Sequence, residues 1–465
     1  MTGMLLRLFL LFVLLSPLPA AAMKIDRVIS PGGIEAWLVQ DRSIPVVALE
    51  VTFRGSGSAV EPVGREGTAS LLAAMLIEGA GEFDSQRFQS ALEDRVVSLG
   101  FDAGLDSFGV SLKTLTENLD FSADMLRLAL TVPRFDTVDL ERIKARTVIG
   151  LRRAAEEPST IAGRLWMSTA FPDHPYGRPT RGTPETVSAL DAGVLRGFLR
   201  ENLARDRLIV GAAGDITPEA LGRLVDRVFG ELPARGSAVE VAEVTPKNLG
   251  RTLAVRRNVP QSVVTLGHHG VKRDDPDYYA ATIVNYILGG GSFNSRLMTE
   301  VREKRGLAYS VYSYIGSYDR AGLMMGGTAT ENARVAQSLE VIRQEWRKMH
   351  DEGPSEGELA NAKTFLTGSF PLRLDASNRI ARLLVSIQYD DLGIDYLDRR
   401  SALIEGVTLA DARRVARRLL APDQLLTVVV GEPAGLAGAE EVPADSVPGA
   451  APTRPARPTP PAGGG

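Results

Sequence analysis

The sequence predicts an α+β fold made of two homologous α/β sandwich halves, each a mostly antiparallel sheet covered by helices on one side. Ser43–Val51 and Asn258–Leu266 both place an apolar–Pro step before a β-branched strand. Asn202–Asp215 and Leu419–Glu432 both contain a helix end, an Asp turn, a buried strand and a Gly followed by an acidic residue. Because the two pairs are separated by nearly the same length of chain, they indicate a tandem duplication. Each half is expected to open with a β-hairpin and a helix and to close with a helix and a strand.

Composition divides the chain further. Residues 1–22 have the features of a signal peptide, and residues 23–232 and 251–433 are the two halves. Residues 233–250 contain Pro and Gly among polar residues and are expected to link the halves. Residues 434–465 are rich in Ala, Pro and Gly, and they are expected to be disordered because they bury too little apolar surface.

The N-terminal segment predicts export to the periplasm. Arg7 precedes the apolar run Leu8–Leu15, and Ala20–Ala22 matches the small-x-small pattern before a signal-peptidase site. The run is too short to span a bilayer, so cleavage after Ala22 is expected to leave no membrane anchor. An uncleaved N-terminal anchor is the alternative, because the length of this run overlaps with that of short anchors.

The overall composition excludes several kinds of site and partner. The chain contains no cysteine, which excludes disulfides, thiolate metal sites and thiol nucleophiles. Its formal net charge is −4 and its basic residues are scattered, so nucleic acid is not an expected partner. The chain is long enough to be stabilised by its core alone.

The segment Asp277–Thr330 is predicted to fold as helix, glycine elbow, helix and hairpin. Asp277 is placed to cap the first helix. Gly289–Gly291 is expected to stop that helix, because glycine reaches the left-handed conformation that a helix C-terminus needs. The predicted elements are helices over Tyr278–Leu288 and Ser295–Lys304 and strands over Leu307–Ile315 and Leu323–Thr328.

A phosphate-binding loop is the other interpretation of the triple glycine. A Walker loop requires Lys followed by Ser or Thr after its last glycine, whereas Ser292–Phe293 stands there. A dinucleotide loop would follow a strand, and this one follows a predicted helix. A helix stop between two packed helices is therefore favoured.

No histidine pair has the spacing of a metal site. The four histidines are His174, His268, His269 and His350, and neither His-x-x-Glu-His nor His-Glu-x-x-His occurs. His268 and His269 are adjacent on a predicted strand, so their side chains point to opposite faces and one is expected to be packed, the other solvated. A Gly-x-Ser-x-Gly nucleophile elbow is also absent from the sequence.

Two stretches carry a family resemblance. Leu288–Ser313, which reads LGGGSFNSRLMTEVREKRGLAYSVYS, closely resembles the C-terminal-half motif of the pitrilysin/insulinase family of zinc metallopeptidases. This family includes the mitochondrial processing peptidase and its bacterial relatives. His174–Leu190 also looks like the family. The resemblance covers nearly all of the chain after residue 22, and it implies that the two sandwich halves together form one half of a clamshell.

Catalytic members of the family bind zinc through an inverted motif, His-x-x-Glu-His, followed by a Glu on a later helix. The matching stretch here is Glu66–Leu76, in which Ser70 and Ala74 occupy the two ligand positions and Ala73 the general-base position. Val148–Leu151 holds none of the family's downstream glutamates. Because zinc needs electron-pair donors, no metal site and no catalytic residue are expected in this chain.

The resemblance also assigns a substrate-binding pair. Arg302 and Tyr309 align with an Arg and a Tyr that lie across the chamber from zinc in the family. By analogy, Tyr309 would stabilise an oxyanion and Arg302 would bind the substrate backbone. The alternative is that Arg302 interacts with its own helix C-terminus and Tyr309 only packs.

The resemblance therefore implies a zinc-free subunit of a heteromeric periplasmic metallopeptidase, inactive alone. Its partner would be a homologous subunit that carries the zinc motif, with zinc expected there, and the substrate would be a peptide or unfolded polypeptide. A non-proteolytic structural or peptide-binding scaffold is the alternative. An autonomous peptidase with substitute ligands is disfavoured, because the donors are missing.

Overall fold

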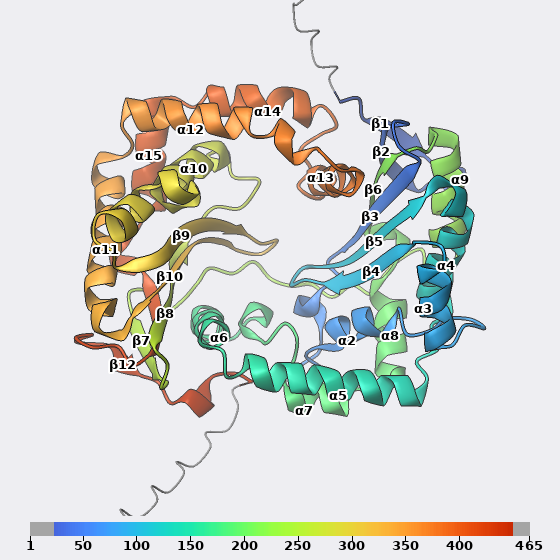
Figure 1. The fold of residues 1–465 in the computed structure, drawn as a ribbon, viewed down its shortest axis with the longest axis horizontal. Helices are drawn as coiled ribbons and strands as arrows, with labels where there is room; N and C mark the ends of the chain where they lie inside the picture. The colour runs from blue at the N-terminus through green and yellow to red at the C-terminus, as the bar shows by residue number, and fades with distance from the viewer. Residues whose placement is uncertain (1–22, 450–465) are drawn as a thin grey trace, which may run out of the picture.

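The computed structural model describes residues 23–449, so the predicted signal peptide and residues 450–465 lie outside the described residues. The described chain contains two six-stranded sheets, one in each half (Figure 1). In the first the strand order is β1-β2-β6-β3-β5-β4, and in the second it is β12-β7-β11-β8-β10-β9. Most strand pairs in both sheets are antiparallel, which confirms the predicted α+β fold class.

The first half begins with two strands of the sheet and returns to it at the end. Its strands are β1 (Asp26–Ile29), β2 (Glu35–Gln40), β3 (Val46–Arg54), β4 (Ser98–Ala103), β5 (Ser107–Leu115) and β6 (Leu208–Gly214). Its helices are α2 (Thr68–Met75), α3 (Ser85–Glu93), α4 (Leu119–Thr131), α5 (Thr137–Ala154), α6 (Pro158–Ala170), α7 (Pro184–Ala189), α8 (Ala192–Asn202) and α9 (Pro218–Phe229).

The second half repeats this plan. Its strands are β7 (Thr252–Arg256), β8 (Gln261–His269), β9 (Ala308–Ser317), β10 (Gly322–Glu331), β11 (Leu426–Gly431) and β12 (Glu440–Glu441). Its helices are α10 (Tyr278–Asn285), α11 (Val335–Glu352), α12 (Glu356–Gly368), α13 (Ser377–Tyr389), α14 (Tyr396–Glu405) and α15 (Leu409–Leu419). The order β2-β6-β3-β5-β4 corresponds to β7-β11-β8-β10-β9, so the two pairs of similar sequence stretches occupy equivalent places in the two sheets.

The strand that closes each half lies between the two strands that open it. β6 pairs parallel to β2 and antiparallel to β3, and β11 pairs in the same way with β7 and β8. In the first half the predicted opening hairpin is formed by β1 and β2. In the second half the prediction is wrong, because β11 lies between β7 and β8. The closing strands are almost continuously apolar, and every residue of β11 is buried, as expected for a central strand with both faces covered.

The outer face of each sheet is covered by helices of the same half (Figure 1). In the first half one core cluster joins apolar side chains of the sheet to those of α2, α3, α4, α8 and α9. In the second half the corresponding cluster joins the sheet to α10, α11, α12 and α15. These two clusters are the sandwich cores that the alternating burial of β3, β5 and β8 predicts.

The inner face of each sheet is covered by a helix from the other half, so the predicted covering of each sheet on one side only is wrong. Helix α6 of the first half packs on β8 and β11, and helix α13 of the second half packs on β3 and β6. Trp166 of α6 is fully buried and donates from Nε1 to the main-chain oxygen of Leu426 (3.0 Å). The two halves thus exchange one helix each, and each sheet has helices on both faces.

Both exchanged helices pack against a glycine of the opposite sheet. A Cβ atom on Gly267 of β8 would lie 3.1 Å from Cζ2 of Trp166. A Cβ atom on Gly211 of β6 would contact the main-chain oxygen of Ala381 and lie 3.0 Å from Cβ of Leu384, both on α13. The close approach of helix to sheet depends on the missing side chain at both positions.

Residues 434–449 differ from the prediction of disorder. β12 pairs parallel to β7, and Arg251 and Arg256 form ion pairs with Glu440 and Glu441. Val447 is buried in the cluster around α6. Main-chain pairing and one buried side chain are enough to place this segment, although its composition resembles that of a flexible tail.

Residues 233–250 connect the halves without a helix or strand. The segment is nevertheless held to both halves, because Val244 N donates to Arg320 O (2.9 Å) and Lys247 N donates to Ala170 O (2.8 Å). Within residues 23–449, we find no helix with the length and apolar character needed to cross a membrane.

The packing of α13 on β6 gives a first testable prediction. Gly211→Ala places a methyl group against the α13 backbone and is expected to cost about 1–3 kcal/mol of unfolding free energy. The matched control is Gly197→Ala in α8, where an added Cβ meets nothing within 4 Å. That change should leave stability unchanged or raise it by up to about 1 kcal/mol, because alanine is the better helix former. Urea denaturation measures both, and equal stability of the two variants would contradict the packing described.

Candidate functional site

Helix α2, which carries the degenerate zinc motif, is capped by a buried carboxylate. Glu61 accepts hydrogen bonds from Gly67 N (2.9 Å) and Ala69 N (2.7 Å) at the start of the helix. Burial raises the pKa of Glu61 to about 8, against the lowering effect of these two hydrogen bonds. The helix is thus held by a cap and by apolar packing, without any metal.

The residues at the former ligand positions lie together on α2. Ser70 and Ala74 are half-buried and one helical turn apart, and Ala73 beside them is buried. The backbone therefore keeps the arrangement that would bring two ligands together, but one hydroxyl and two methyl groups offer no set of donors for zinc. In residues 23–449, no group of three or more His, Cys, Asp or Glu side chains is placed to hold a metal ion. The residues present do not fit zinc.

The predicted elements of the segment Asp277–Thr330 are found close to the expected positions. α10 continues into a π-helical turn at Tyr286–Gly290, and a second π-helical segment spans Met298–Glu303. The hairpin is formed by β9 and β10. Asp277 is the residue before α10, but its side chain does not cap the helix. Its carboxylate instead pairs with Arg414 and Arg418 of α15, and the Arg414 hydrogen bond contributes most to lowering its pKa to about 2.

The triple glycine has a different physical role from the one predicted. None of Gly289–Gly291 has a positive φ, whereas Ser292 adopts +52°. A Cβ atom on Gly289 would lie 2.6 Å from the main-chain nitrogen of Ser313, on β9. Gly289 is needed because the chain passes close to β9, whereas Gly290 and Gly291 lie against Asn285 and Tyr286 of the preceding helical turn. The left-handed residue that redirects the chain is Ser292.

Arg302 and Tyr309 are in direct contact. Arg302 Cζ lies 4.7 Å from the centre of the Tyr309 ring and 4.8 Å from that of Phe293. The guanidinium is thus between two aromatic rings, an arrangement in which each ring attracts the cation. Tyr309 is 79% exposed and Phe293 59% exposed, so neither ring is packed in the core.

A β-bulge turns Tyr309 outward. Ser310 is paired with Ala329 and Ala308 with Thr330, so Tyr309 has no partner on β10. In a regular strand Tyr309 would share the core-facing side with Val311. Because of the extra residue, Ala308 lies on the core side and Tyr309 is exposed. Bulges often redirect a side chain in this way beside a functional site.

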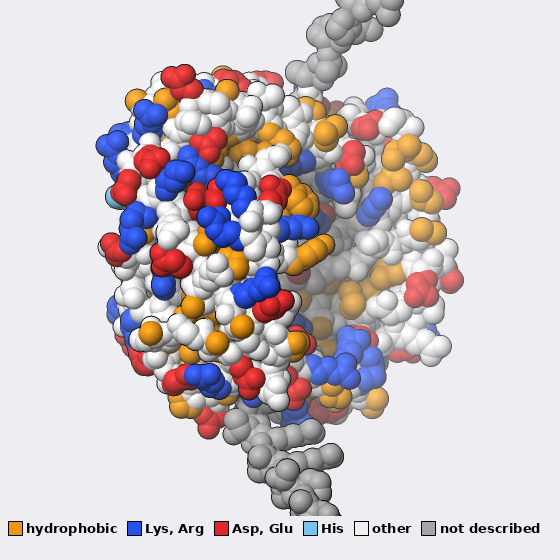
Figure 2. All heavy atoms as spheres, turned by 60° about the vertical axis from the view of Figure 1, so that its left-hand side comes forward, with side chains coloured by type: hydrophobic (Ala, Val, Ile, Leu, Met, Phe, Trp, Pro, Cys, Tyr) orange, Lys and Arg blue, Asp and Glu red, His pale blue; other side chains and the backbone are white. Residues whose placement is uncertain are grey.

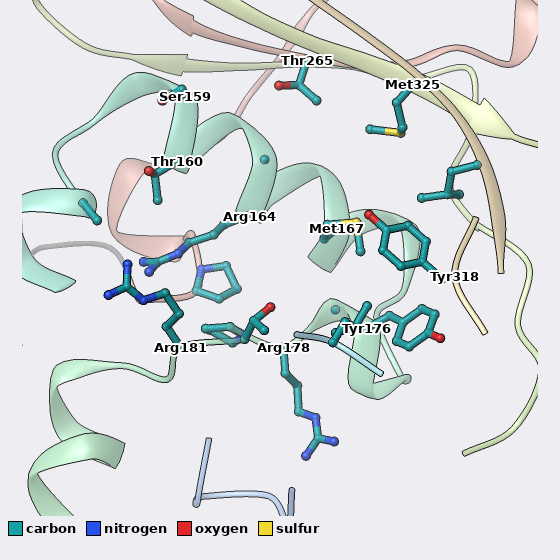
Figure 3. Close-up of a pocket in the computed structure, with 18 of the residues that line it drawn as sticks. Ser159, Thr160, Arg164, Met167, Tyr176, Arg178, Arg181, Thr265, Tyr318 and Met325 are labelled. Atoms are coloured by element: carbon teal, nitrogen blue, oxygen red, sulfur yellow. The ribbon is translucent and has the colours of Figure 1, made fainter. Parts of the chain in front are cut away.

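A cavity of about 550 Å³ lies on the inner face of the second sheet, next to β9 (Figure 3). The surface is hollowed between the two halves, as the space-filling view shows (Figure 2). The cavity wall comes from both halves: helix α6, the loop 176–181 and the inner sides of β8, β9 and β10. Three of its residues, Tyr312, Tyr314 and Tyr318, follow Tyr309 along the same strand and turn.

The histidines have structural roles. His268 is fully buried, its Nε2 accepts from Trp346 Nε1 (3.0 Å), and burial lowers its pKa to about 4. His269 is exposed, so the prediction of one packed and one solvated histidine is confirmed. His174 Nδ1 accepts from Tyr176 N (3.2 Å) and holds the start of the loop 176–181.

Comparison with known proteins identifies the family. A family model described as the peptidase M16 inactive domain matches residues 189–366. An uncharacterized zinc protease of Streptomyces coelicolor is 32% identical over 320 residues, which cover 67% of this chain and 68% of that protein. The chain belongs to the peptidase M16 family. The predicted resemblance to the pitrilysin/insulinase metallopeptidases is thereby confirmed.

Other M16 proteins agree with the loss of zinc ligands. A protein named non-peptidase homolog YmxG, from Helicobacter pylori, is 26% identical over 356 residues, 76% of this chain and 81% of that protein. The crystal structure of a peptidase M16 inactive domain from Pseudomonas fluorescens has a TM-score of 0.82 at 25% identity and covers 90% of this chain and 99% of its own. The chain is an M16 homologue of the inactive type.

Two functional candidates were missed by reasoning from the sequence. Phe293 stands directly after the glycine elbow, but its contact with Arg302 depends on the turn at Ser292. Arg164 and Arg181 meet in the cavity from different elements. The only sequence signal was the family-like stretch His174–Leu190, which contains Arg181 but gave no role for it.

The side chains at the zinc-motif positions of α2 give a prediction about the metal content of the purified protein. The isolated chain should bind no stoichiometric zinc and cleave no peptide, because Ser70, Ala73 and Ala74 replace two ligands and the base. Elemental analysis of the purified protein measures this directly. One tightly bound zinc per chain, removed together with peptidase activity by a chelator, would contradict the prediction.

Proposed function

We propose that this chain is a zinc-free subunit of a heteromeric periplasmic peptidase. A homologous subunit with an intact His-x-x-Glu-His motif would supply zinc and close on this chain to form a chamber. The chain would contribute half of the chamber wall and the Arg302–Tyr309 pair, and the substrates would be peptides or unfolded polypeptides. The assembly would be a heterodimer in its simplest form.

One observation supports the proposal: the family's zinc donors are absent from α2, whereas Tyr309 is exposed and in contact with Arg302. Arg302 is held between Phe293 and Tyr309, and the bulge keeps the Tyr309 ring out of the core. Exposure of two large aromatic rings costs solvation free energy unless a ligand or partner covers them. The arrangement therefore supports contact with a ligand or a partner at this surface.

The chemistry of the pair suits peptide hydrolysis. The Tyr309 hydroxyl could donate to the carbonyl oxygen of the scissile bond, where negative charge develops in the transition state. The Arg302 guanidinium has no hydrogen-bond acceptor within the described residues, so its donors are available to carbonyl oxygens of a peptide. The partner subunit would provide both the zinc site and the nucleophile.

The periplasmic location rests on the sequence of residues 1–22. The exported chain is expected to begin at Met23, because Ala20–Ala22 precedes it with the pattern of a cleavage site. The intact mass of the protein recovered from the periplasm tests this. A protein that retains Leu8–Leu15 and sediments with membranes would refute it.

The Arg302–Tyr309 pair gives the decisive test. Tyr309→Phe removes one hydroxyl and should lower turnover of the assembled complex about 100- to 1000-fold, since one oxyanion donor is lost. Arg302→Ala should raise KM, because it removes ground-state contacts to the peptide. Phe293→Ala should also raise KM, because it removes one of the two rings that hold the Arg302 guanidinium. Phe293→Tyr keeps a ring at this position and should restore the original KM. The measurement is the cleavage of a quenched fluorescent peptide by the co-expressed subunits.

The control for Phe293 is another exposed ring nearby. Phe365 of α12 is 47% exposed and stacks on Tyr286, not on Arg302, so Phe365→Ala should leave KM unchanged. Size-exclusion chromatography shows whether each variant still assembles. Normal turnover in all variants would leave the chain as a wall or scaffold, and loss of assembly would place the pair in the subunit interface.

A further inference from the structure

The cavity beside β9 is basic, although the chain as a whole is acidic. Arg164, Arg178 and Arg181 are among its lining residues, and no Asp or Glu is. The formal net charge of the full chain is −4. A concave site with low-dielectric walls and one sign of charge attracts ligands of the other sign.

Two of the arginines point into the same end of the cavity. Arg164 extends from α6 and Arg181 from the loop before α7, and their guanidinium groups lie side by side (Figure 3). Burial lowers the pKa of Arg164, and the charge of Arg181 lowers it further. In the described part of the chain, Arg164 donates from Nη1 to the main-chain oxygen of Gly449 (3.0 Å) and forms no ion pair. The two like charges therefore face each other without a carboxylate between them.

The third arginine is fixed elsewhere. Arg178 donates to the main-chain oxygens of Glu61 (2.8 Å) and Ala59 (3.3 Å), and its guanidinium points away from the other two (Figure 3). It fastens the loop 176–181 to the turn around residues 59–61 that precedes α2. This attachment holds the backbone that carries Arg181.

The other end of the cavity is apolar with a few hydroxyl groups. Met167 of α6 and Met325 of β10 lie there with Tyr318 (Figure 3). Tyr312 and Tyr314 line the same wall, with ring centres 6.3 Å apart and nearly parallel. A small inorganic anion would leave this surface uncovered. A peptide with one carboxylate would match both ends, because backbone and apolar side chains suit the tyrosines and methionines.

The cavity is within reach of the proposed substrate-binding pair. Tyr309 and Tyr312 are three residues apart on β9, which corresponds to about 10 Å along a strand. Both side chains are on the exposed side of the strand. A peptide that contacts Arg302 and Tyr309 can thus continue along the strand into the cavity.

We infer that this cavity anchors the substrate by one of its carboxylates, which binds between Arg164 and Arg181. The ligand is a peptide that carries either a free C-terminus or an Asp or Glu side chain a few residues from the cleaved bond. Paired guanidinium groups bind a carboxylate through several charge-assisted hydrogen bonds. This inference rests on the proposed peptide-binding function and adds a preference for acidic or C-terminal segments to it.

The test measures binding of labelled peptides to the isolated chain by fluorescence anisotropy. Three octapeptides of one sequence are compared: with a free C-terminus, with an amidated C-terminus, and amidated with one Asp. A carboxylate should strengthen binding roughly 10- to 100-fold over the neutral peptide, as charged hydrogen bonds do. The first and third peptides separate the terminal from the side-chain source. Arg164→Ala and Arg181→Ala should each remove this advantage, and Arg164→Lys should keep part of it.

Arg200→Ala is the matched control, because Arg200 is exposed on α8 and does not line the cavity. It changes the net charge equally and should leave binding unchanged. If Arg164→Ala lowers the melting temperature, the exposed Arg181 still provides the test. Equal binding of all three peptides, or acidic binding that survives Arg181→Ala, overturns the inference.

The assay also separates this inference from the proposed function. Arginine-dependent binding in a chain that activates no zinc-bearing partner would overturn the heteromeric peptidase and leave the anchoring site. Turnover that depends on Tyr309, combined with peptide binding that ignores Arg164 and Arg181, would overturn the anchoring site alone.

Discussion

The exchange of α6 and α13 between the halves is the constraint on which the rest of the structure depends. Each sheet would expose an apolar inner face if its half stood alone, and the helix that covers this face belongs to the other half. Neither half can therefore bury its own core fully, and the duplicated units form one body. The glycines at 211 and 267 allow the helices to approach the sheets closely enough for that burial. Helix α6 also forms one wall of the cavity, so the packing that joins the halves shapes the site.

The tip of the β9–β10 hairpin is fastened to the first half and fixes the strand that carries the site. The Tyr176 hydroxyl donates to Asp106 (2.6 Å) and accepts from the main-chain nitrogen of Arg320 (2.9 Å). At the tip itself, Asp319 N donates to the Asp106 carboxylate (3.1 Å). The Tyr389 hydroxyl of α13, the second-half helix that covers the first sheet, donates to the Asp319 carboxylate (2.9 Å). An edge strand held at its tip in this way keeps its tyrosines in a defined position. Tyr309 and two of the tyrosines that line the cavity are thereby carried by one strand whose tip is fixed.

Helix α2, which the resemblance aligns with the zinc-binding helix of the family, is held in the fold by interactions that need no zinc ligand. Helix α2 keeps a carboxylate cap from Glu61 and a buried apolar face, and these interactions do not involve the positions at which zinc ligands would stand. For this reason the family fold persists at a TM-score of 0.82 to an inactive-domain structure, while the metal donors are absent from Ser70, Ala73 and Ala74.

The sequence by itself determined the duplication, the α+β class and the helix–elbow–helix–hairpin order, because these depend on local periodicity. The assignment of Ser70, Ala73 and Ala74 to the zinc-motif positions came from the resemblance to the family. The sequence did not determine which helix covers which sheet. The amphipathic pattern of α6 and α13 shows that each helix has an apolar face, but it does not show which sheet that face contacts. The continuous apolar runs of β6 and β11 predicted buried strands, but not the second layer of helices that covers them. Only the tertiary structure placed Phe293 on Arg302 and Arg164 beside Arg181. Those contacts join residues far apart in the chain or depend on one left-handed residue, and no local pattern encodes them.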